Sequence, residues 1–424
     1  MKLIRNMFLV FTIMQSFNLL LKISCQPKCY APATYIEPVI EADCTPVNNV
    51  VKELTVSGYE RFSDIQATEL KNKCLDKNEH RDNKAVGISS TVDCKRRNRF
   101  TETYSYVGHS LNNESDNSYI NSAKFSGRLV EKDGKYVYSE ENAGSQGFIA
   151  ATNAPLGDFR KMITEFSTIG RDRNFAVATV QCKTFDKESR VDRSDCFSGN
   201  LFNGGAFEKE NTQLAFYRAL KNNNIVNIVQ LTNFAEEPVI PAPPKTPSPC
   251  FCKAKADRYF ADLENTEQPL FDHEYKSTTA KVLTLSKTSP IEYNGSTEVR
   301  KLKFTDVNPQ NTHKVTHYHY RSWQDFSVPT GKDLTGLYAL IKFIRAELDA
   351  GRSTIVHCTG GIGRTGTFIA AVLTSKLKPN VKFDLFQFIL KMREKRPDLV
   401  EAVPQVQLII KNMLLTKLSR KFKK

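Results

Sequence analysis

The sequence lacks several features that would assign a function directly. It has no convincing internal repeat, no cluster of residues at metal-ligand spacing and no known nucleic-acid-binding module. Beyond residue 21 it also has no apolar run long enough to cross a bilayer. We therefore expect neither a repeat protein nor a metalloprotein, and no membrane span after the first residues.

Acidic residues are too few to balance the basic ones. The chain has 46 Asp and Glu against 60 Lys and Arg, a net charge of +14. A basic surface attracts acidic substrates, phosphopeptides or sulfated glycans over long range. Because the basic residues are dispersed, a nucleic-acid partner is not favoured. With 40% hydrophobic residues over 424 positions, the chain can bury a sizeable core, in one large domain or two.

The N-terminus has the pattern of an export signal. Lys2 and Arg5 precede a short apolar run, residues 7–21, which polar residues interrupt. This pattern predicts a signal peptide over residues 1–25 and a secreted, extracellular protein. An uncleaved membrane anchor is the alternative. A Cys- and Pro-bearing extension, residues 26–56, would follow.

Cysteine usage agrees with export. Of ten cysteines, one lies in the predicted signal and another, Cys358, is set aside below as a nucleophile. The even remainder allows complete disulfide pairing in an oxidising compartment, although the sequence leaves the pairing open. These residues are Cys29, Cys44, Cys74, Cys94, Cys182, Cys196, Cys250 and Cys252. Asn113 and Asn294 begin glycosylation sequons, which matter only in a secreted protein.

The most informative stretch is IVHCTGGIGRTG, residues 355–366. β-favouring residues lead into it, glycines turn it, and an apolar run at helical density follows from Thr367. In such a loop the backbone N–H groups and the positive end of the helix point at one spot and hold an anion. Arg364 adds a planar fork of donors. The positive potential of this loop favours the thiolate form of Cys358. The thiolate is a nucleophile that can attack the phosphorus of a bound phosphate group.

Cysteine six residues before arginine is a weak signal alone. Cys252 and Arg258 have the same spacing, but no glycine lies between them, and we interpret that pair as accidental. For Cys358 the alternative is a buried cysteine beside a tight turn. The glycines and the flanking His357 and Thr365 favour the anion-binding loop.

This loop resembles the signature of the protein tyrosine phosphatases, a His-Cys pair, five residues, then Arg, Ser or Thr, and Gly. The resemblance extends to HYHYRSWQDFSVP, residues 317–329, where the family has Trp-Pro-Asp on a mobile loop. Trp323, the only tryptophan, and Asp325 match, and Gln324 replaces the usual proline. The resemblance implies that Asp325 protonates the departing tyrosine oxygen. The alternative is an exposed loop aspartate.

Two further stretches resemble the family's substrate-binding segments. RNRFTE, residues 97–102, is similar to an Asn-Arg-Tyr segment whose ring packs on the substrate's phenyl group, and Phe100 keeps that ring. In REKRPDLVEAVPQ, residues 393–405, Gln405 matches the second of two family glutamines. Glu401 replaces the first, which orients the hydrolytic water. A carboxylate there can hold water but adds negative charge beside a phosphate.

The resemblance implies an α/β fold, a highly twisted mixed β-sheet flanked by helices, over residues 57–418. Insertions are expected near 156–211 and 237–252, and a basic tail at 419–424. A strand is expected at 147–155, followed by one helix and one strand. The first candidate pair is a helix at 158–165 with a strand at 175–180. The second is a helix at 214–220 with a strand at 225–231, and we prefer this second pair. Later strands are expected at 282–286 and 298–304, and helices at 334–348, 384–394 and 405–418.

The resemblance predicts a secreted phosphotyrosine phosphatase that requires no metal or other cofactor. Cys358 attacks phosphorus, and His357 and Thr365 tune its thiolate. Asp325 acts as the acid and then as the base for water, which Gln405 helps to place. The remaining residues expected to bind substrate are Phe100, Trp323, Thr359, Gly360, Gly361, Ile362, Gly363 and Glu401. The expected partner is a phosphotyrosine protein or peptide, and the oligomeric state stays open.

Two rival functions remain. One is a non-enzymatic module that captures phosphotyrosine without efficient release, and it is motivated by the departures at Gln324, Phe100 and Glu401. Oxidation of a reactive thiolate in an oxidising compartment would also favour this module. The other rival is a phosphatase that also acts on lipids or phosphoserine, against which Phe100 argues.

Overall fold

The structure is a computed structural model, and it describes the following residues: 99, 103, 105, 109–111, 119–141, 146–157, 179–181, 211–236, 251–261, 264–270, 274–284, 297–325, 327–378 and 382–421. For residues 179–181, 235–236, 251–254, 281–284 and 416–421 it describes the backbone alone.

Several expectations lie outside the described residues and stay predictions. They concern the signal peptide 1–25, the extension 26–56, Phe100, both sequons and most of the two insertions. Of the cysteines, only the backbone of Cys252 and the whole of Cys358 are described. The disulfide prediction is therefore also outside the described part of the chain.

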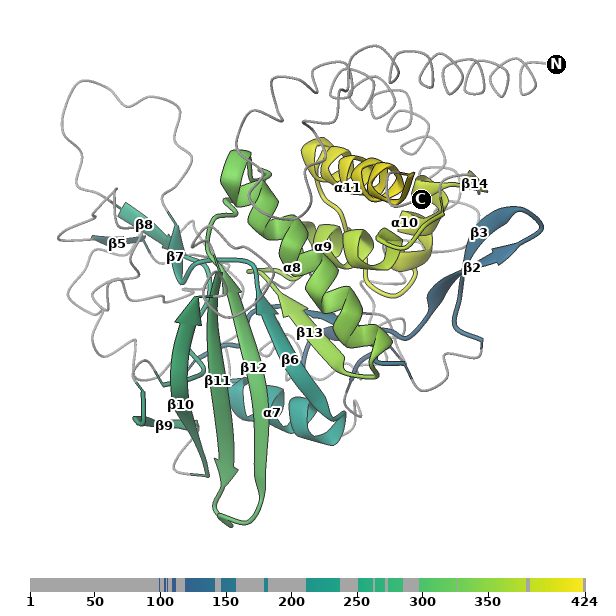
Figure 1. The fold of residues 1–424 in the computed structure, drawn as a ribbon. Helices are drawn as coiled ribbons and strands as arrows, with labels where there is room; N and C mark the ends of the chain where they lie inside the picture. Colours follow the sequence, from purple (N-terminus) through teal and green to yellow (C-terminus); the bar gives the residue numbers. More distant parts are fainter. Residues whose placement is uncertain are drawn as a thin grey trace, which may run out of the picture.

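The main sheet has eight strands in the order β1-β4-β13-β6-β12-β11-β10-β9. The four central strands β4, β13, β6 and β12 are parallel neighbours, and the outer pairs are antiparallel. Strand direction changes strongly between β10 and β13 (Figure 1). The predicted twisted mixed sheet is thus confirmed. The strands are β1 (Ser122–Phe125), β4 (Ile149–Thr152), β6 (Ile225–Gln230), β9 (Glu267–Leu270), β10 (Tyr275–Thr284), β11 (Thr297–Asp306), β12 (Thr312–Tyr320) and β13 (Ser353–His357).

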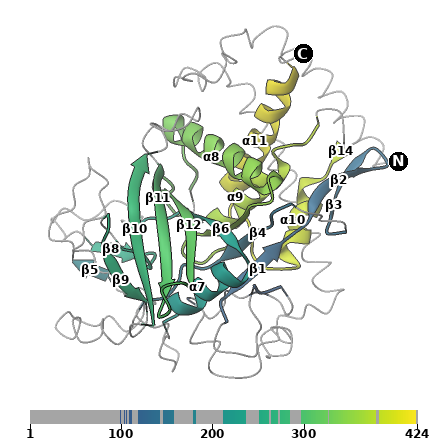
Figure 2. The same cartoon turned by 60° about the horizontal axis from the view of Figure 1, so that its bottom comes forward.

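Helices cover both faces of this sheet, which is why its central strands are apolar. Consecutive residues enter opposite cores: Val356 packs with the helices α8 to α11, and Ile355 packs with α7 on the other face (Figure 2). All five residues of β13 are buried, as expected for a parallel central strand. The helices are α7 (Gln213–Asn222), α8 (Gly331–Asp349), α9 (Gly363–Thr374), α10 (Leu385–Arg393) and α11 (Val403–Lys421). None of these described helices is long and apolar enough to cross a membrane.

The preferred register is confirmed. Helix α7 and strand β6 are the second predicted helix and strand, and β6 lies in the centre of the sheet. From the first pair only Thr179–Gln181 is described, as strand β5 of a separate small sheet. Helix α10 also follows its prediction, since the Asp384 carboxylate accepts hydrogen bonds from the backbone N–H groups of Phe386 and Gln387.

Two three-stranded sheets flank the main one. The first contains β2 (Arg128–Lys132), β3 (Lys135–Ser139) and β14 (Lys382–Phe383). Asp133 and Gly134 both have positive φ between β2 and β3, the conformation of a tight hairpin turn. The second contains β5, β7 (Ala235–Glu236) and β8 (Phe251–Ala254). Residues that follow β8 reach the site described next.

Candidate active site

The glycine-rich loop connects β13 directly to α9. The helix begins at Gly363, four residues before the apolar run at Thr367, so Arg364 already lies in the first turn. Ile362 occupies the N-cap and offers no side-chain oxygen to the first backbone N–H groups. An anion can satisfy these groups instead, and the positive end of the helix favours it.

Hydrogen bonds on the outer side of the loop fix the direction of its peptides. The carbonyl oxygen of Thr359 accepts from the N–H of Ala154 at 3.0 Å. The carbonyl oxygens of Gly360 and Gly361 accept from the Arg396 guanidinium at 2.9 and 2.8 Å. Because N–H and C=O point in opposite directions across a planar peptide, the following N–H groups face the inner side of the loop. The loop is therefore built as an anion cradle.

Arg396 is a structural part of the site that the sequence reasoning did not identify. It is fully buried and also donates to Ser105 Oγ at 2.6 Å and Asn121 Oδ1 at 2.5 Å. Burial lowers its pKa to about 10, while nearby Tyr119 and Cys358 act in the opposite direction. The guanidinium remains charged at neutral pH and adds positive potential behind the loop.

Cys358 and His357 sit at the start of the loop. Cys358 is a free cysteine and is 4% exposed. His357 is fully buried, with Nδ1 3.1 Å from the Cys358 carbonyl oxygen and Nε2 2.8 Å from the Tyr259 hydroxyl. Burial, then Arg99 and Arg364, lower the pKa of His357 to about 4 despite the carbonyl contact. A neutral imidazole donates to the Cys358 carbonyl from Nδ1 and accepts the Tyr259 proton at Nε2.

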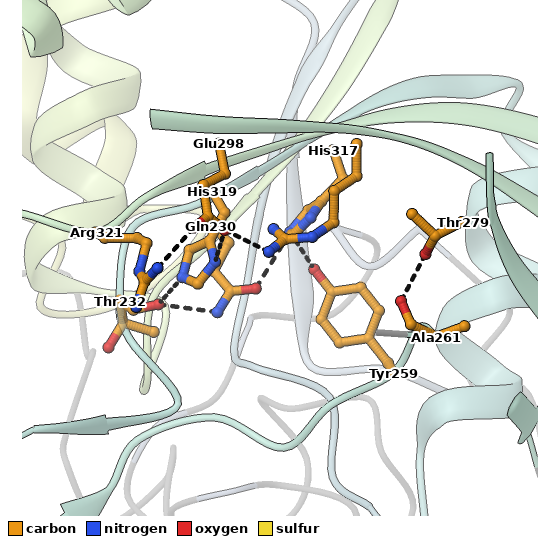
Figure 3. A network of polar contacts seen from close by, with 10 residues as sticks. Gln230, Thr232, Tyr259, Ala261, Thr279, Glu298, His317, His319 and Arg321 are labelled. Carbon is orange, nitrogen blue, oxygen red and sulfur yellow. Dashed lines mark hydrogen bonds and ion pairs between the residues drawn. The ribbon is translucent and has the colours of Figure 1, made fainter. Parts of the chain in front are cut away.

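Tyr259 continues this contact into a buried polar network (Figure 3). Its hydroxyl lies 3.2 Å from His317 Nε2, which also contacts the Gln230 side-chain oxygen at 3.2 Å. His319 contacts the carbonyl oxygen of Thr232 at 2.9 Å. Burial lowers the pKa of both His317 and His319 far below its ordinary value, so both are neutral.

Residues 321–330, which connect β12 to α8 and carry Asp325, are called the acid loop below. Glu298 lies at the end of the network nearest this loop. Its carboxylate pairs with Arg300 and, at 2.6 Å, with Arg321, the first residue after β12. Burial alone would raise the pKa of Glu298, but the two arginines hold it below its ordinary value. These half-buried ion pairs lie at the point where the acid loop leaves the sheet.

The loop after β12 places Asp325 over the cradle. Arg364, 1% exposed, donates to the Trp323 carbonyl oxygen at 2.7 Å, and its Nη2 lies 3.1 Å from Asp325 Oδ1. Lys255 Nζ lies 2.5 Å from Asp325 Oδ2. Trp323 is buried and donates to the Ser327 carbonyl oxygen at 2.7 Å. Asp325 is thus an ion-paired residue of the site, and the loop forms a turn without the usual proline.

Glu401 and Gln405 stand against the first turn of α9. Gln405 is 1% exposed, and its side-chain oxygen accepts from the backbone N–H groups of Glu401 at 2.9 Å and Ala402 at 3.3 Å. A Cβ on Gly363 would lie 2.5 Å from Glu401 Oε2 and 3.0 Å from Gln405 Nε2. Although Glu401 as a residue is exposed, partial desolvation, then Asp325 and Asp398, raise the pKa of its carboxyl to about 7 against Arg364 and Lys255.

For two other predicted residues, Thr365 and Phe100, the structure does not test the predicted role. Thr365 is buried, but its hydroxyl has no hydrogen-bond partner in the described part of the chain, so its role toward the thiolate stays a prediction. Phe100 is outside the described residues. Its neighbour Arg99 is described, and it pairs with Asp257 at 2.6 Å and donates to the Ala154 and Pro155 carbonyl oxygens.

The second cysteine and arginine pair forms no loop of this kind. Cys252 lies in strand β8, and the Arg258 guanidinium stacks 4.8 Å from the Phe234 ring centre. The same stretch nevertheless supplies Lys255 and Tyr259 to the site. Sequence reasoning missed both, because their contacts with Asp325 and His357 join residues 70 and 98 positions apart.

Comparisons with known proteins agree with this geometry. Residues 208–415 match the family model of protein-tyrosine phosphatase. Receptor-type tyrosine-protein phosphatase H of Homo sapiens is 40% identical over 111 residues, 25% of this chain and 10% of that protein. Tyrosine-protein phosphatase 2 of Dictyostelium discoideum is 24% identical over 247 residues, 54% of this chain and 58% of that protein. The chain therefore spans between a tenth and about three-fifths of these curated relatives.

A solved structure shares the fold. PTPN18 in complex with HER2-pY1248 phosphopeptides superposes with a TM-score of 0.52 and 17% sequence identity, covering 85% of this chain and 99% of that chain. At this identity the likeness concerns the fold alone. The family itself is shown by the family match: residues 208–415, which contain β13, the anion loop and α9, belong to the protein-tyrosine phosphatase family.

Proposed function

We propose that this protein hydrolyses phosphotyrosine through a cysteinyl-phosphate intermediate. One observation carries the proposal. The Asp325 carboxylate lies 3.1 Å from the Arg364 guanidinium, at the loop that begins with Cys358. A nucleophile, an oxyanion-binding group and a carboxyl group for proton transfer are thereby gathered at one cradle.

Each group has a role in the first step. The Cys358 thiolate attacks phosphorus, so that an S–P bond forms while the bond between phosphorus and the tyrosine oxygen breaks. Arg364 and the inward N–H groups of the loop hold the phosphoryl oxygens as charge develops. A bound phosphoryl group competes with Asp325 for Arg364. Asp325, once protonated, then delivers its proton to the departing oxygen.

The substrate class follows from the relatives and from the sequence. Both curated relatives cited above are named as tyrosine-protein phosphatases, and PTPN18 was solved with phosphopeptides. Arg99 anchors the segment that carries Phe100 to Ala154, which itself contacts the Thr359 carbonyl. The expectation from the family resemblance that the Phe100 ring packs on the substrate's phenyl group favours phosphotyrosine over phosphoserine.

The test compares phosphate release by the full-length protein from phosphotyrosine peptide, phosphoserine peptide and phosphoinositide, with and without reductant. We expect turnover of phosphotyrosine only, and no turnover by Cys358→Ser. Release from all three substrates would instead support the broader phosphatase. Absence of turnover with retained phosphopeptide binding would contradict the enzyme and favour a binding module.

We also propose that the protein is secreted, with residues 1–25 removed as a signal peptide, disulfides among its remaining cysteines, and glycans at Asn113 and Asn294. The support is the charge and hydropathy pattern of the N-terminus and the even cysteine count. Expression in a eukaryotic cell with mass analysis of the medium tests this. Full-length protein retained inside the cell, with unglycosylated asparagines, would overturn it.

A further inference from the structure

Hydrolysis of a cysteinyl phosphate requires a group that accepts a proton from the attacking water. Three side chains with a carboxyl or amide oxygen contact or face the first turn of α9: Asp325, Gln405 and Glu401. The following inference deepens the proposed function and rests on it. The three side chains differ in whether an oxygen is still available to accept a proton.

Gln405 has none. Its side-chain oxygen already accepts from two backbone N–H groups, those of Glu401 and Ala402. An amide oxygen has two lone pairs, and both are occupied. Its Nε2, the atom nearer Gly363, is only a donor. Gln405 can therefore orient a water molecule but cannot take its proton.

Asp325 is held by cations on both oxygens. Oδ1 pairs with Arg364 at 3.1 Å and Oδ2 with Lys255 at 2.5 Å. Once Asp325 has given its proton to the leaving group, the same carboxylate is formed again beside Lys255. With Arg364 on the phosphoryl group, Lys255 still stabilises this carboxylate and weakens it as the base for water that the family resemblance implies.

Glu401 is in the opposite situation. Its carboxyl makes no hydrogen bond or ion pair with another described residue, and the residue is exposed to water. The groups that face it are Asp325, Asp398, Arg364 and Lys255, besides the neutral Gln405. Desolvation and the two carboxylates outweigh the two cations and raise its pKa to about 7, where a general base works best near neutral pH.

We propose that Glu401 is the general base for hydrolysis of the cysteinyl phosphate. The water oxygen attacks phosphorus while one water proton passes to the Glu401 carboxylate. The P–S bond breaks, and its electron pair stays on Cys358 as the thiolate. Phosphate leaves with the remaining water proton, and Glu401 then loses its proton to solvent. No other co-reactant is required.

The rates of the two chemical steps should differ in their dependence on pH. Formation of the intermediate does not use Glu401, whereas its hydrolysis needs the carboxylate. Below about pH 7 hydrolysis should slow about tenfold per pH unit while the burst of phenol release persists. The intermediate therefore accumulates at acidic pH.

The experiment is rapid-quench kinetics of the full-length protein with an aryl phosphate, over about pH 5.5 to 8.5. Burst rate reports formation of the intermediate, and the later linear rate reports its hydrolysis. Glu401→Gln keeps size and hydrogen bonding but cannot take a proton. Glu394→Gln, an exposed side chain on the surface of the same region, is the matched control.

For wild type and Glu394→Gln we expect hydrolysis to rise with pH and level off near pH 7. In Glu401→Gln we expect that inflection to disappear and the rate at high pH to fall about 100-fold, with the burst unchanged. An inflection that persists in Glu401→Gln, or a wild-type hydrolysis rate independent of pH, overturns the role of Glu401 alone. Absence of any burst in the wild type overturns the proposed function itself.

Discussion

Gly361 shows how one residue sets the cradle. Its φ is +74°, and a Cβ there would overlap the carbonyl of Thr152 on β4. Gly134 has a similar φ of +71° but open space around it. An alanine at Gly134 would therefore meet backbone strain alone, whereas an alanine at Gly361 would meet backbone strain and steric overlap.

We predict that Gly134→Ala lowers the free energy of unfolding by about 1 kcal/mol, the cost of a left-handed alanine. Gly361→Ala should lower it by at least about 3 kcal/mol and abolish phosphate binding. Chemical denaturation and phosphate titration measure both. Equal losses in the two variants would show that Gly361 is not packed against β4.

Arg396 supports the cradle by hydrogen bonds to two carbonyl groups, at Gly360 and Gly361. Lysine has one compact ammonium group and cannot replace the fork. We predict that Arg396→Lys weakens inhibition by vanadate, a phosphate analogue, about tenfold. Arg352→Lys is the control, since Arg352 pairs with Glu347 at the surface. Unchanged inhibition in Arg396→Lys would refute this supporting role.

At this scale the sequence revealed residues that act within one contiguous loop. The sequence identifies Cys358, Arg364 and the glycines as one motif because they all lie within twelve consecutive positions, residues 355–366. Lys255, Tyr259 and Arg396 could not be identified in this way. Each reaches the site from a distant element, and their residue types are ordinary in isolation.

At the scale of elements, β12 carries two buried histidines toward the acid loop. The pKa values of His317, His319 and His357 are all lowered in the folded protein by burial. Above the ordinary value of about 6.5 both folded and unfolded chains hold these residues neutral. As pH falls below it, the unfolded chain takes up protons first and stability is lost.

We predict that the free energy of unfolding falls between pH 7 and pH 5, by roughly 2 kcal/mol from His357 alone, given its folded pKa of about 4. The loss from His357 ends below that value. Denaturation at each pH measures it, and His319→Gln should reduce the slope. A stability independent of pH over this range would mean that these histidines are not buried as neutral groups.

Glu298 joins β11 to the start of the acid loop. We predict that Glu298→Gln costs about 3 kcal/mol of stability, because two partly buried arginines lose their counter-charge. Glu267→Gln removes an exposed pair with Lys276 and should cost less than about 0.5 kcal/mol. Comparable costs for the two variants would contradict the structural role of the ion pairs around Glu298.

Elements were predictable where local patterns agree with their tertiary surroundings. The apolar face of α8, with Leu334, Leu337 and Ile341 buried, and the cap at Asp384 both follow directly from the sequence. The start of α9 at Gly363 did not follow from the sequence, because glycine disfavours a helix. Glycine is favoured at this position because Glu401 and Gln405, as placed, leave no space for a side chain. Placement of β6 in the sheet needed the family resemblance.

At the scale of the molecule, the domain is larger than the family match. The match begins at residue 208, yet β1 and β4 form one side of the main sheet. Thr152, Asn121 and Ser105 contact the cradle or Arg396 from this earlier part. The expected domain, residues 57–418, includes these residues, and its bounds stay a prediction.

A fragment of residues 208–424 should therefore not fold cooperatively. It lacks two strands of the sheet and the buried partners of Arg396. Thermal unfolding followed by circular dichroism, beside the full-length chain, measures this. A sharp transition and phosphate binding in the fragment would show that the earlier residues are dispensable.

The central claim is that Cys358 forms a covalent phosphoryl intermediate. Its most direct measurement is mass analysis of full-length protein quenched at acidic pH after mixing with a phosphotyrosine peptide. We predict one added phosphoryl group on the peptide containing Cys358, and none in Cys358→Ser. Phosphate release without that adduct, or with the adduct on another residue, would contradict the mechanism derived from this site.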